Sequence, residues 1–180
     1  MSATARAWCR AGALCGLVVG ADQAAKAAIE AHLTAGEEIE VLGPLKLTLA
    51  HNSGVAFGLA GGAGLGLVLV TLLALAAVAF LFARDPTRPG IWVAAGLLAG
   101  GALGNLADRV RADAVTDFVD LSPWPAFNLA DICITAGVVL LLVIYLRGGA
   151  QPPALCNPEG YKAQGDRGRD RQGGPRATRE

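Results

Sequence analysis

Four long apolar stretches, separated by polar segments, dominate the pattern of the chain. They cover residues 7–29, 61–83, 90–107 and 129–146. In the last three stretches the only charged residue is Asp131, two positions after the fourth one begins. At about 1.5 Å per helical residue, each stretch is long enough to cross the roughly 30 Å hydrocarbon core of a bilayer. The pattern therefore predicts a membrane all-α protein with four transmembrane helices.

Polar segments add two further expectations. Residues 38–57 alternate apolar and polar positions around Gly-Pro and Asn-Ser-Gly turn signals, which predicts a small β-sheet at the membrane surface. Residues 148–180 are rich in Gly, Pro, Gln and Arg and cannot bury enough apolar surface to become ordered. We expect one membrane domain over residues 1–147 and a disordered cytoplasmic tail after it.

Composition and charge support a membrane protein and predict its orientation. Charged residues make up 17% of the chain, whereas soluble domains carry about 25%. Acids outnumber bases by five to two in residues 22–60 and again in residues 108–131, while the remaining connections are basic. Because basic loops stay in the cytoplasm, we expect both termini inside and both acidic segments outside.

The first apolar stretch leaves an alternative open. Arg6 and Arg10 precede the apolar run Ala11–Ala21, which is also the pattern of a cleaved signal peptide. In that case the mature protein would contain three spans.

Polar residues that could do chemistry collect at the outer ends of the predicted spans. They are Asp22, Lys26, Asn105, Asp108, Arg109, Asp117 and Asp131. Singly, each has a structural explanation: Asp131 could cap a helix, and Asp22–Lys26 and Asp108–Arg109 could be ion pairs. Together they suggest function, because ionisable groups at membrane depth are costly.

Two aspartates that meet in a partly dry site would share one proton. One carboxylate could then take a proton from water while the other donates to a carbonyl oxygen, which suits peptide hydrolysis without a covalent intermediate. Other chemistries have less support, since His32 and His51 lack metal-site spacing and Cys133 has no obvious histidine partner. We expect no metal ion, no cofactor and no nucleic-acid partner.

Five sequence blocks, in order within the four spans, resemble the lipoprotein signal peptidases (signal peptidase II). They are DQAAK at 22–26, HNSGVAFGL at 51–59, GGALGNLADRV at 100–110, VTDFVD at 115–120 and PAFNLAD at 125–131. The resemblance covers residues 7–147 and departs from the family at Ala25, where Ser or Thr is usual, and in the short segment LSPWP at 121–125.

The resemblance implies an aspartyl endopeptidase of the bacterial cytoplasmic (inner) membrane. Such an enzyme removes signal peptides from prolipoproteins that bear a diacylglyceryl cysteine, cutting just before that cysteine. By motif position, Asp117 and Asp131 would be catalytic. The site-lining positions would be Asn52, Gly54, Asn105, Arg109 and Asn128, and the structural polar positions Asp22, Lys26 and Asp108. We expect a monomer surrounded by membrane lipid.

The fourth span should present its polar residues to one site. Asp117 would lie in the loop just before this span, and Asn128, three residues before Asp131, would share its helical face. Phe127 and Trp124 would lie at the membrane interface and help to exclude water from the site.

An alternative class is a small membrane transporter or proton relay that uses the same carboxylates. A relay would favour ionisable residues spread through the membrane depth. Here the second and third spans have no charged residue in their interiors, which favours the peptidase.

Overall fold

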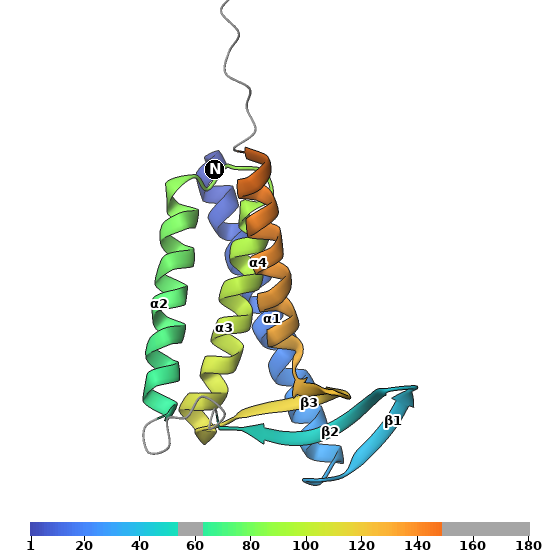
Figure 1. Ribbon diagram of the computed structural model, residues 1–180. Helices are drawn as coiled ribbons and strands as arrows, with labels where there is room; N and C mark the ends of the chain where they lie inside the picture. Colours follow the sequence, from blue (N-terminus) through green and yellow to red (C-terminus); the bar gives the residue numbers. More distant parts are fainter. Residues whose placement is uncertain (54–62, 149–180) are drawn as a thin grey trace, which may run out of the picture. The chain divides into compact units, whose positions relative to one another are not determined.

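A computed structural model of the chain describes residues 1–53 and 63–148. Four helices stand side by side and a small sheet lies across one end of them (Figure 1). The helices are α1 (Ala3–His32), α2 (Ala63–Arg84), α3 (Ile91–Ala112) and α4 (Leu129–Gly148). The strands are β1 (Glu38–Leu42), β2 (Leu45–Asn52), β3 (Val115–Leu121) and β4 (Trp124–Phe127).

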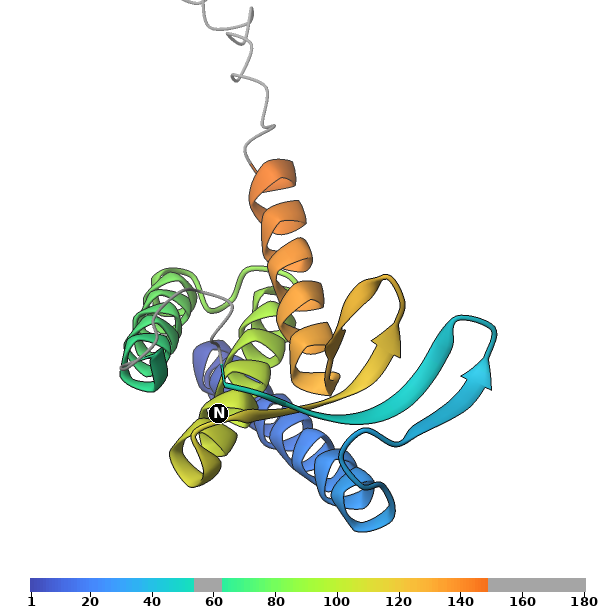
Figure 2. The ribbon, with the colours of Figure 1, turned by 60° about the horizontal axis from the view of Figure 1, so that its bottom comes forward.

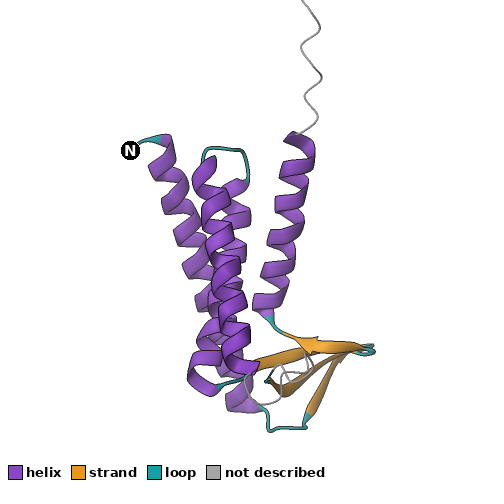
Figure 3. Cartoon of the chain, turned by 60° about the vertical axis from the view of Figure 1, so that its left-hand side comes forward, coloured by secondary structure: helices purple, strands orange, loops and turns teal. Residues whose placement is uncertain are grey.

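All four helices are long and apolar enough to cross a membrane, which confirms the predicted fold class. Most residues of α2 and α4 are exposed, and because these residues are apolar the two helices suit contact with lipid. Of the four helices, α3 is the most buried. Chain direction alternates from helix to helix, so the N-terminus and the α2–α3 link lie at the end opposite the sheet (Figures 1 and 3).

Glycines on α3 allow this central helix to approach its neighbours closely. A Cβ atom on Gly100 would lie 2.7 Å from Val18 Cβ of α1, and one on Gly101 would lie 2.5 Å from the carbonyl oxygen of Ala130 at the start of α4. Any larger side chain at these positions would push the helices apart. The glycine-rich run at 96–104 is therefore a packing surface for both α1 and α4.

The sheet is larger than the sequence predicts, because both polar segments contribute to it. Its order is β1-β2-β3-β4 and every pairing is antiparallel. Figure 2 shows this curved sheet from the end of the helices. We expected Asp117 in a loop, which was wrong: VTDFVD forms β3 and pairs with β2, placing Asp117 opposite Ala50. The alternation of Val, Asp and Phe in that block was the available signal.

Two helices extend further than the apolar stretches indicate. The first runs from Ala3 to His32, and α3 continues to Ala112, beyond the charged residues Asp108 and Arg109. Asp108 and Arg109 thus lie on a helical turn of α3 beyond the apolar stretch 90–107. The expected tail at 148–180 lies outside the described residues, apart from Gly148 at the end of α4.

Candidate active site

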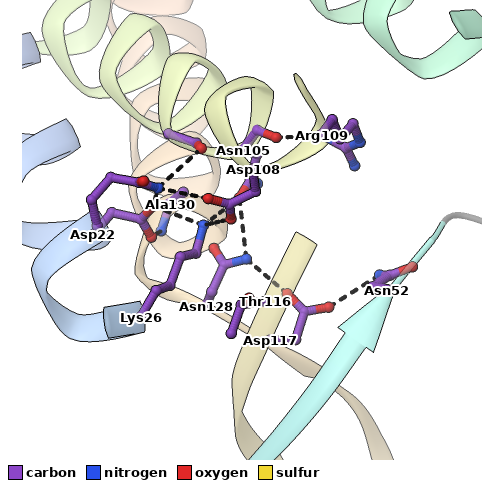
Figure 4. A network of polar contacts seen from close by, with 12 residues as sticks. Asp22, Lys26, Asn52, Asn105, Asp108, Arg109, Thr116, Asp117, Asn128 and Ala130 are labelled. Atoms are coloured by element: carbon purple, nitrogen blue, oxygen red, sulfur yellow. Dashed lines mark hydrogen bonds and ion pairs between the residues drawn. The ribbon is translucent and has the colours of Figure 1, made fainter. Parts of the chain in front are cut away.

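Residues from five elements converge where the sheet meets the helices. Figure 4 shows this cluster of polar side chains. They are Asp22 and Lys26 of α1, Asn52 of β2, Asn105, Asp108 and Arg109 of α3, Asp117 of β3, Asn128, and Asp131 of α4. Gly54, the remaining candidate, lies outside the described residues. Residues that are far apart in the sequence therefore lie together in one region of the molecule.

The start of α4 is fixed by Asn128, the residue before its first turn. Asn128 Oδ1 accepts a hydrogen bond of 3.0 Å from the backbone N–H of Asp131, and Asp131 Oδ2 accepts one of 3.3 Å from the backbone N–H of Asn128. This reciprocal arrangement is a capping box. We expected Asn128 on the helical face of Asp131, and it lies instead at the N-cap, where it is fully buried. Asp131 thus takes part in the cap of α4, as the capping explanation predicted. Its other oxygen, Oδ1, accepts a hydrogen bond from Asn105.

Asp117 is 3% exposed and lies between two asparagine side chains (Figure 4). Asn52 Nδ2 donates to Asp117 Oδ2 at 3.1 Å, and Asn128 Nδ2 donates to Asp117 Oδ1 at 2.7 Å. Burial away from water raises the pKa of the Asp117 carboxyl, and the nearby charge of Asp131 raises it further. The two amide hydrogen bonds and the charge of Lys26 act in the opposite direction, but the net pKa is raised.

A short chain of amides connects the two aspartates. Asn128 Nδ2 contacts Asn105 Oδ1 at 3.2 Å as well as Asp117, and Asn105 Nδ2 donates to Asp131 Oδ1 at 2.8 Å. Within residues 1–53 and 63–148, neither Asp117 nor Asp131 forms an ion pair. The two carboxylates are therefore held near each other by neutral donors alone.

A second group of carboxylates, beside the first, is bound to a cation. Lys26 Nζ lies 2.8 Å from Asp22 Oδ2 and 2.6 Å from Asp108 Oδ2, and all three side chains are largely buried. The Asp22–Lys26 pair agrees with the i,i+4 expectation. An Asp108–Arg109 pair does not form, because consecutive helical residues do not face each other and Lys26 already contacts Asp108. Lys26 also donates to Asn105 Oδ1 at 3.0 Å, which joins the two groups.

Asp22 anchors the beginning of α4 from another helix. Its Oδ1 accepts a 2.9 Å hydrogen bond from the backbone N–H of Ala130, one of the N–H groups that a helix start leaves unpaired. A Cβ on Gly104 would come within 2.7 Å of Asp22 Oδ2, so this contact depends on a glycine at 104. The α1 residue thereby positions the turn that carries Asp131.

An apolar groove of about 270 Å³ opens beside Asp131 between α2, α3 and α4. Asn105, Arg109 and Asp131 form its polar end, while side chains such as Val70, Leu75, Leu98 and Ile134 line the rest. The half-buried Arg109 donates to the backbone oxygen of Asn105 at 3.4 Å. Its remaining N–H groups can bind a carbonyl group that enters the groove.

A second hollow, of about 470 Å³, lies on the other side of Asp131. Trp124 and Phe127 line it together with one face of α4. We expected these two aromatic residues to lie at the membrane interface and to exclude water from the site. Trp124 is 70% exposed and its ring lines this hollow together with Asp131, while its place at the membrane interface stays a prediction.

Gln23 is a functional candidate that the sequence analysis did not single out. Its Nε2 donates to Asp108 Oδ1 at 2.8 Å and to the Gly104 backbone oxygen at 3.3 Å, and its Oε1 accepts from Arg111 at 2.7 Å. The signal was its place next to Asp22 in DQAAK. Among the described residues, no group of three His, Cys, Asp or Glu side chains could hold a metal ion.

The sequence and the fold of this chain are similar to those of known signal peptidases and bacterial membrane enzymes. The family model of signal peptidase (SPase) II matches residues 14–147. The lipoprotein signal peptidase of Pelotomaculum thermopropionicum is 45% identical over 127 residues, which cover 69% of this chain and 84% of the relative. That of Moorella thermoacetica is 43% identical over 130 residues, covering 69% of this chain and 85% of the relative.

Two solved structures, both described as bacterial membrane enzymes, share the fold. One, at 31% identity, has a TM-score of 0.73 and covers 81% of this chain and 92% of the other. The second, also at 31% identity, has a TM-score of 0.67 and covers 76% and 92%. Since the family model spans the four helices and the sheet, and relatives above 40% identity align over more than two thirds of both chains, the chain belongs to the signal peptidase II family.

Proposed function

We propose that this protein removes signal peptides from prolipoproteins and that Asp117 and Asp131 are its catalytic pair. The enzyme is an aspartic peptidase and a multi-pass protein of the bacterial inner membrane, as the family and the four apolar helices indicate. One observation supports the choice of this pair: both carboxylates are bound by neutral amides, next to an apolar groove, while the neighbouring aspartates contact Lys26. A transporter or proton relay has no support from the relatives.

The proton of the pair resides on Asp117 in this proposal. Its raised pKa favours the protonated form, whereas Asp131 lines the groove and can contact water and substrate there. Asp131 takes a proton from the attacking water, and the Asp117 proton passes to the carbonyl oxygen of the scissile bond. As the C–N bond of the tetrahedral gem-diol intermediate breaks, the proton on Asp131 moves to the leaving nitrogen and one hydroxyl proton returns to Asp117, which gives a carboxylic acid and a free amine and restores the starting protonation of the pair.

In this proposal, the signal peptide binds in the groove beside Asp131. Its apolar side chains suit the hydrophobic part of a signal sequence, and Arg109 and Asn105 at its polar end suit backbone carbonyl groups. Asp131 borders the groove and also the hollow beside Trp124 and Phe127. An extended peptide that passes Asp131 would reach both, so the lipid-bearing cysteine and the signal sequence can lie on opposite sides of the scissile bond.

Cleavage of a defined substrate tests the proposal. The purified protein in detergent, given a prolipoprotein with a diacylglyceryl cysteine, should release the signal peptide with the cysteine at the new N-terminus. The same precursor without the lipid should be cleaved much more slowly. Equal rates for the two precursors, or a cut elsewhere, would contradict the assigned substrate.

Orientation and oligomeric state complete the proposal. The basic residues at the start of α1 and in the α2–α3 link favour a cytoplasmic location for both termini and an outer location for the aspartates. The proposed working unit is a monomer. A reporter fused after Arg147 should be active only as a cytoplasmic probe. Activity of a periplasmic reporter at that position would contradict the orientation.

A further inference from the structure

One face of α1 carries three charged residues on successive turns, and each of them contacts a different element of the site. Asp22, Lys26 and Glu30 are spaced four residues apart, which places them above one another on the helix. Asp22 accepts a hydrogen bond from the Ala130 N–H at the start of α4. Lys26 donates to Asn105 of α3. Glu30, which lies outside all of the sequence blocks, contacts the sheet.

Glu30 accepts a 2.6 Å hydrogen bond from the hydroxyl of Thr116 in β3, although 86 residues separate the two. Glu30 reaches solvent, whereas Thr116 is 5% exposed. Because a buried hydroxyl without an acceptor is costly, the Glu30 carboxylate stabilises this placement of Thr116. Thr116 directly precedes Asp117, and successive strand residues point to opposite faces of a sheet. Glu30 therefore contacts the strand from the face opposite the Asp117 carboxyl.

The start of β3, residues 115–117, is paired with another strand on one edge only. On that edge it pairs with β2, next to a register irregularity between Leu47 and Ala50. On the other edge, in the described part of the chain, β4 pairs with Val119 and Leu121, further along the strand. Side-chain contacts therefore contribute more to the position of residues 115–117 than they would in a strand paired on both sides.

A hollow of about 270 Å³ lies between α1, the end of α3 and the start of β3. Most of its lining is polar and consists of Gln23, Lys26, Glu30, Asp108, Arg111 and Thr116. Among the described residues, alanines are the only apolar side chains that line it. Apolar packing therefore contributes little across this hollow, and the hydrogen bond between Glu30 and Thr116 connects α1 to the start of β3 directly.

We propose that Glu30 is a positioning residue of the cleavage reaction, which holds the Asp117 carboxyl in place through Thr116. This inference rests on the proposed catalytic role of Asp117. Among the described residues, none of β3 lines the groove beside Asp131. A loosened β3 should therefore leave the binding of the signal peptide intact and slow the chemical step, since a misplacement of about 1 Å can cost roughly 10²-fold in rate.

Steady-state kinetics of signal-peptide release from a diacylated precursor, at a temperature where every variant is folded, test this role. Glu30→Ala should lower kcat by roughly three- to tenfold, less than a full 1 Å misplacement would, with KM unchanged. Glu30→Gln should restore most of the rate, because its carboxamide oxygen can still accept from Thr116. Thr116→Val should lower kcat similarly, and the double variant Glu30→Ala/Thr116→Val should lose no more than either single variant.

Several outcomes contradict the role. An unchanged kcat in Glu30→Ala would exclude it, and so would losses that multiply in the double variant. A raised KM with normal kcat would assign Glu30 to substrate binding. If Asp117→Asn keeps its turnover, the proposed catalytic pair is wrong; if Asp117→Asn is inactive while Glu30→Ala has normal kcat, only the role of Glu30 is wrong.

Glu37→Ala is the matched control. Glu37 also accepts from a threonine hydroxyl, that of Thr34 at 3.1 Å, but it lies in the exposed connection between α1 and β1, so its loss should leave kcat unchanged. Hydrogen–deuterium exchange of the full-length protein adds a measurement that does not depend on cleavage. Backbone amides of residues 115–119 should exchange faster in Glu30→Ala and at the normal rate in Glu37→Ala. Equal exchange in Glu30→Ala and the unchanged protein would mean that Glu30 does not hold this strand.

Discussion

The two groups of aspartates at the sheet end of the helices differ in what neutralises them. Asp22 and Asp108 share the buried ammonium group of Lys26 at 2.8 and 2.6 Å. Asp117 and Asp131 both contact Asn128, and within the described part of the chain their hydrogen-bond donors are neutral N–H groups. A cation beside a buried carboxylate favours the charged form, whereas burial without an ion pair favours the neutral form, as the raised pKa of Asp117 illustrates. The first group is therefore suited to structure and the second to proton transfer.

This difference indicates how one fold can contain four nearby aspartates without mixing their roles. Asn105 contacts both groups, since it accepts from Lys26 and donates to Asp131. Lys26 thus orients the Asn105 side-chain amide, which donates to Asp131. The positive charge of Lys26 is paired with Asp22 and Asp108. In the proposed mechanism, the Lys26 group therefore positions Asp131 through Asn105 and takes no part in proton transfer.

The largest effect should come from removing proton transfer at the pair. Asp117→Asn and Asp131→Asn should each lower the cleavage rate by roughly 10²–10⁴-fold, because general acid–base catalysis contributes about that much. Initial rates of signal-peptide release from a diacylated precursor measure the effect. Asp120→Asn, three residues from Asp117 on the same strand, is the control and should retain near-normal turnover.

Stability should respond differently from activity in Asp117→Asn. Since burial raises the pKa of Asp117 in the folded protein, its contribution to stability is present at low pH and is lost as the pH rises through the folded pKa. The amide removes that ionisation, so the melting temperature at neutral pH should stay the same or rise. A large fall would mean that the Asp117 carboxylate is ionised and has a structural role.

Lys26→Met should lower the free energy of unfolding by about 3–5 kcal/mol, since it leaves two buried carboxylates without their cation. The matched control is Lys46→Met. Lys46 forms an ion pair of similar length, 2.7 Å to Glu38, but it lies on the solvent-exposed sheet, where such pairs contribute little. Thermal unfolding in detergent compares the two. Similar losses for both would mean that burial does not distinguish them.

The glycine that admits Asp22 gives a smaller and more local effect. Gly104→Ala would place a Cβ 2.7 Å from Asp22 Oδ2, which should cost about 1–3 kcal/mol in stability as overpacking. Gly20→Ala on α1, where a Cβ meets nothing within 4 Å, should instead stabilise by up to about 1 kcal/mol through helix propensity. Opposite shifts in melting temperature are expected, and a destabilised Gly20→Ala would contradict the packing argument.

The four helices could be predicted from the sequence, because a long run of apolar residues is typical of a transmembrane helix. The sheet was only half predicted: β4 has four residues, and the pairing of β3 with β2 joins segments more than sixty residues apart in the chain. A separation of 108 residues likewise hid the hydrogen bond from the Ala130 backbone N–H to Asp22, which no local pattern encodes.

The site residues themselves were found through sequence blocks, whereas their grouping was not. Asp108 next to Arg109 suggested an ion pair, but the helical arrangement turned Asp108 toward Lys26. Gln23 was overlooked because an uncharged side chain gives no electrostatic signal in sequence. Which aspartates contact a cation, and which contact amides, is decided by the packing of α1 against α3.

The finest test asks which member of the pair carries the proton. Asn52 Nδ2 donates to Asp117 Oδ2, a hydrogen bond that favours the ionised form and lowers its pKa. Asn52→Ala should therefore raise the pKa of Asp117 further. If Asp117 works protonated, the alkaline limb of the kcat/KM profile reports its ionisation, and this limb should move to higher pH while the acid limb stays in place. If Asp117 works ionised, the acid limb should move instead, and the proton would belong to Asp131. Because the two groups titrate as a coupled pair, each limb is an apparent value, so the comparison uses the direction of movement between Asn52→Ala and the unchanged enzyme. A profile in which neither limb moves would contradict a role for Asn52 in setting the protonation of Asp117.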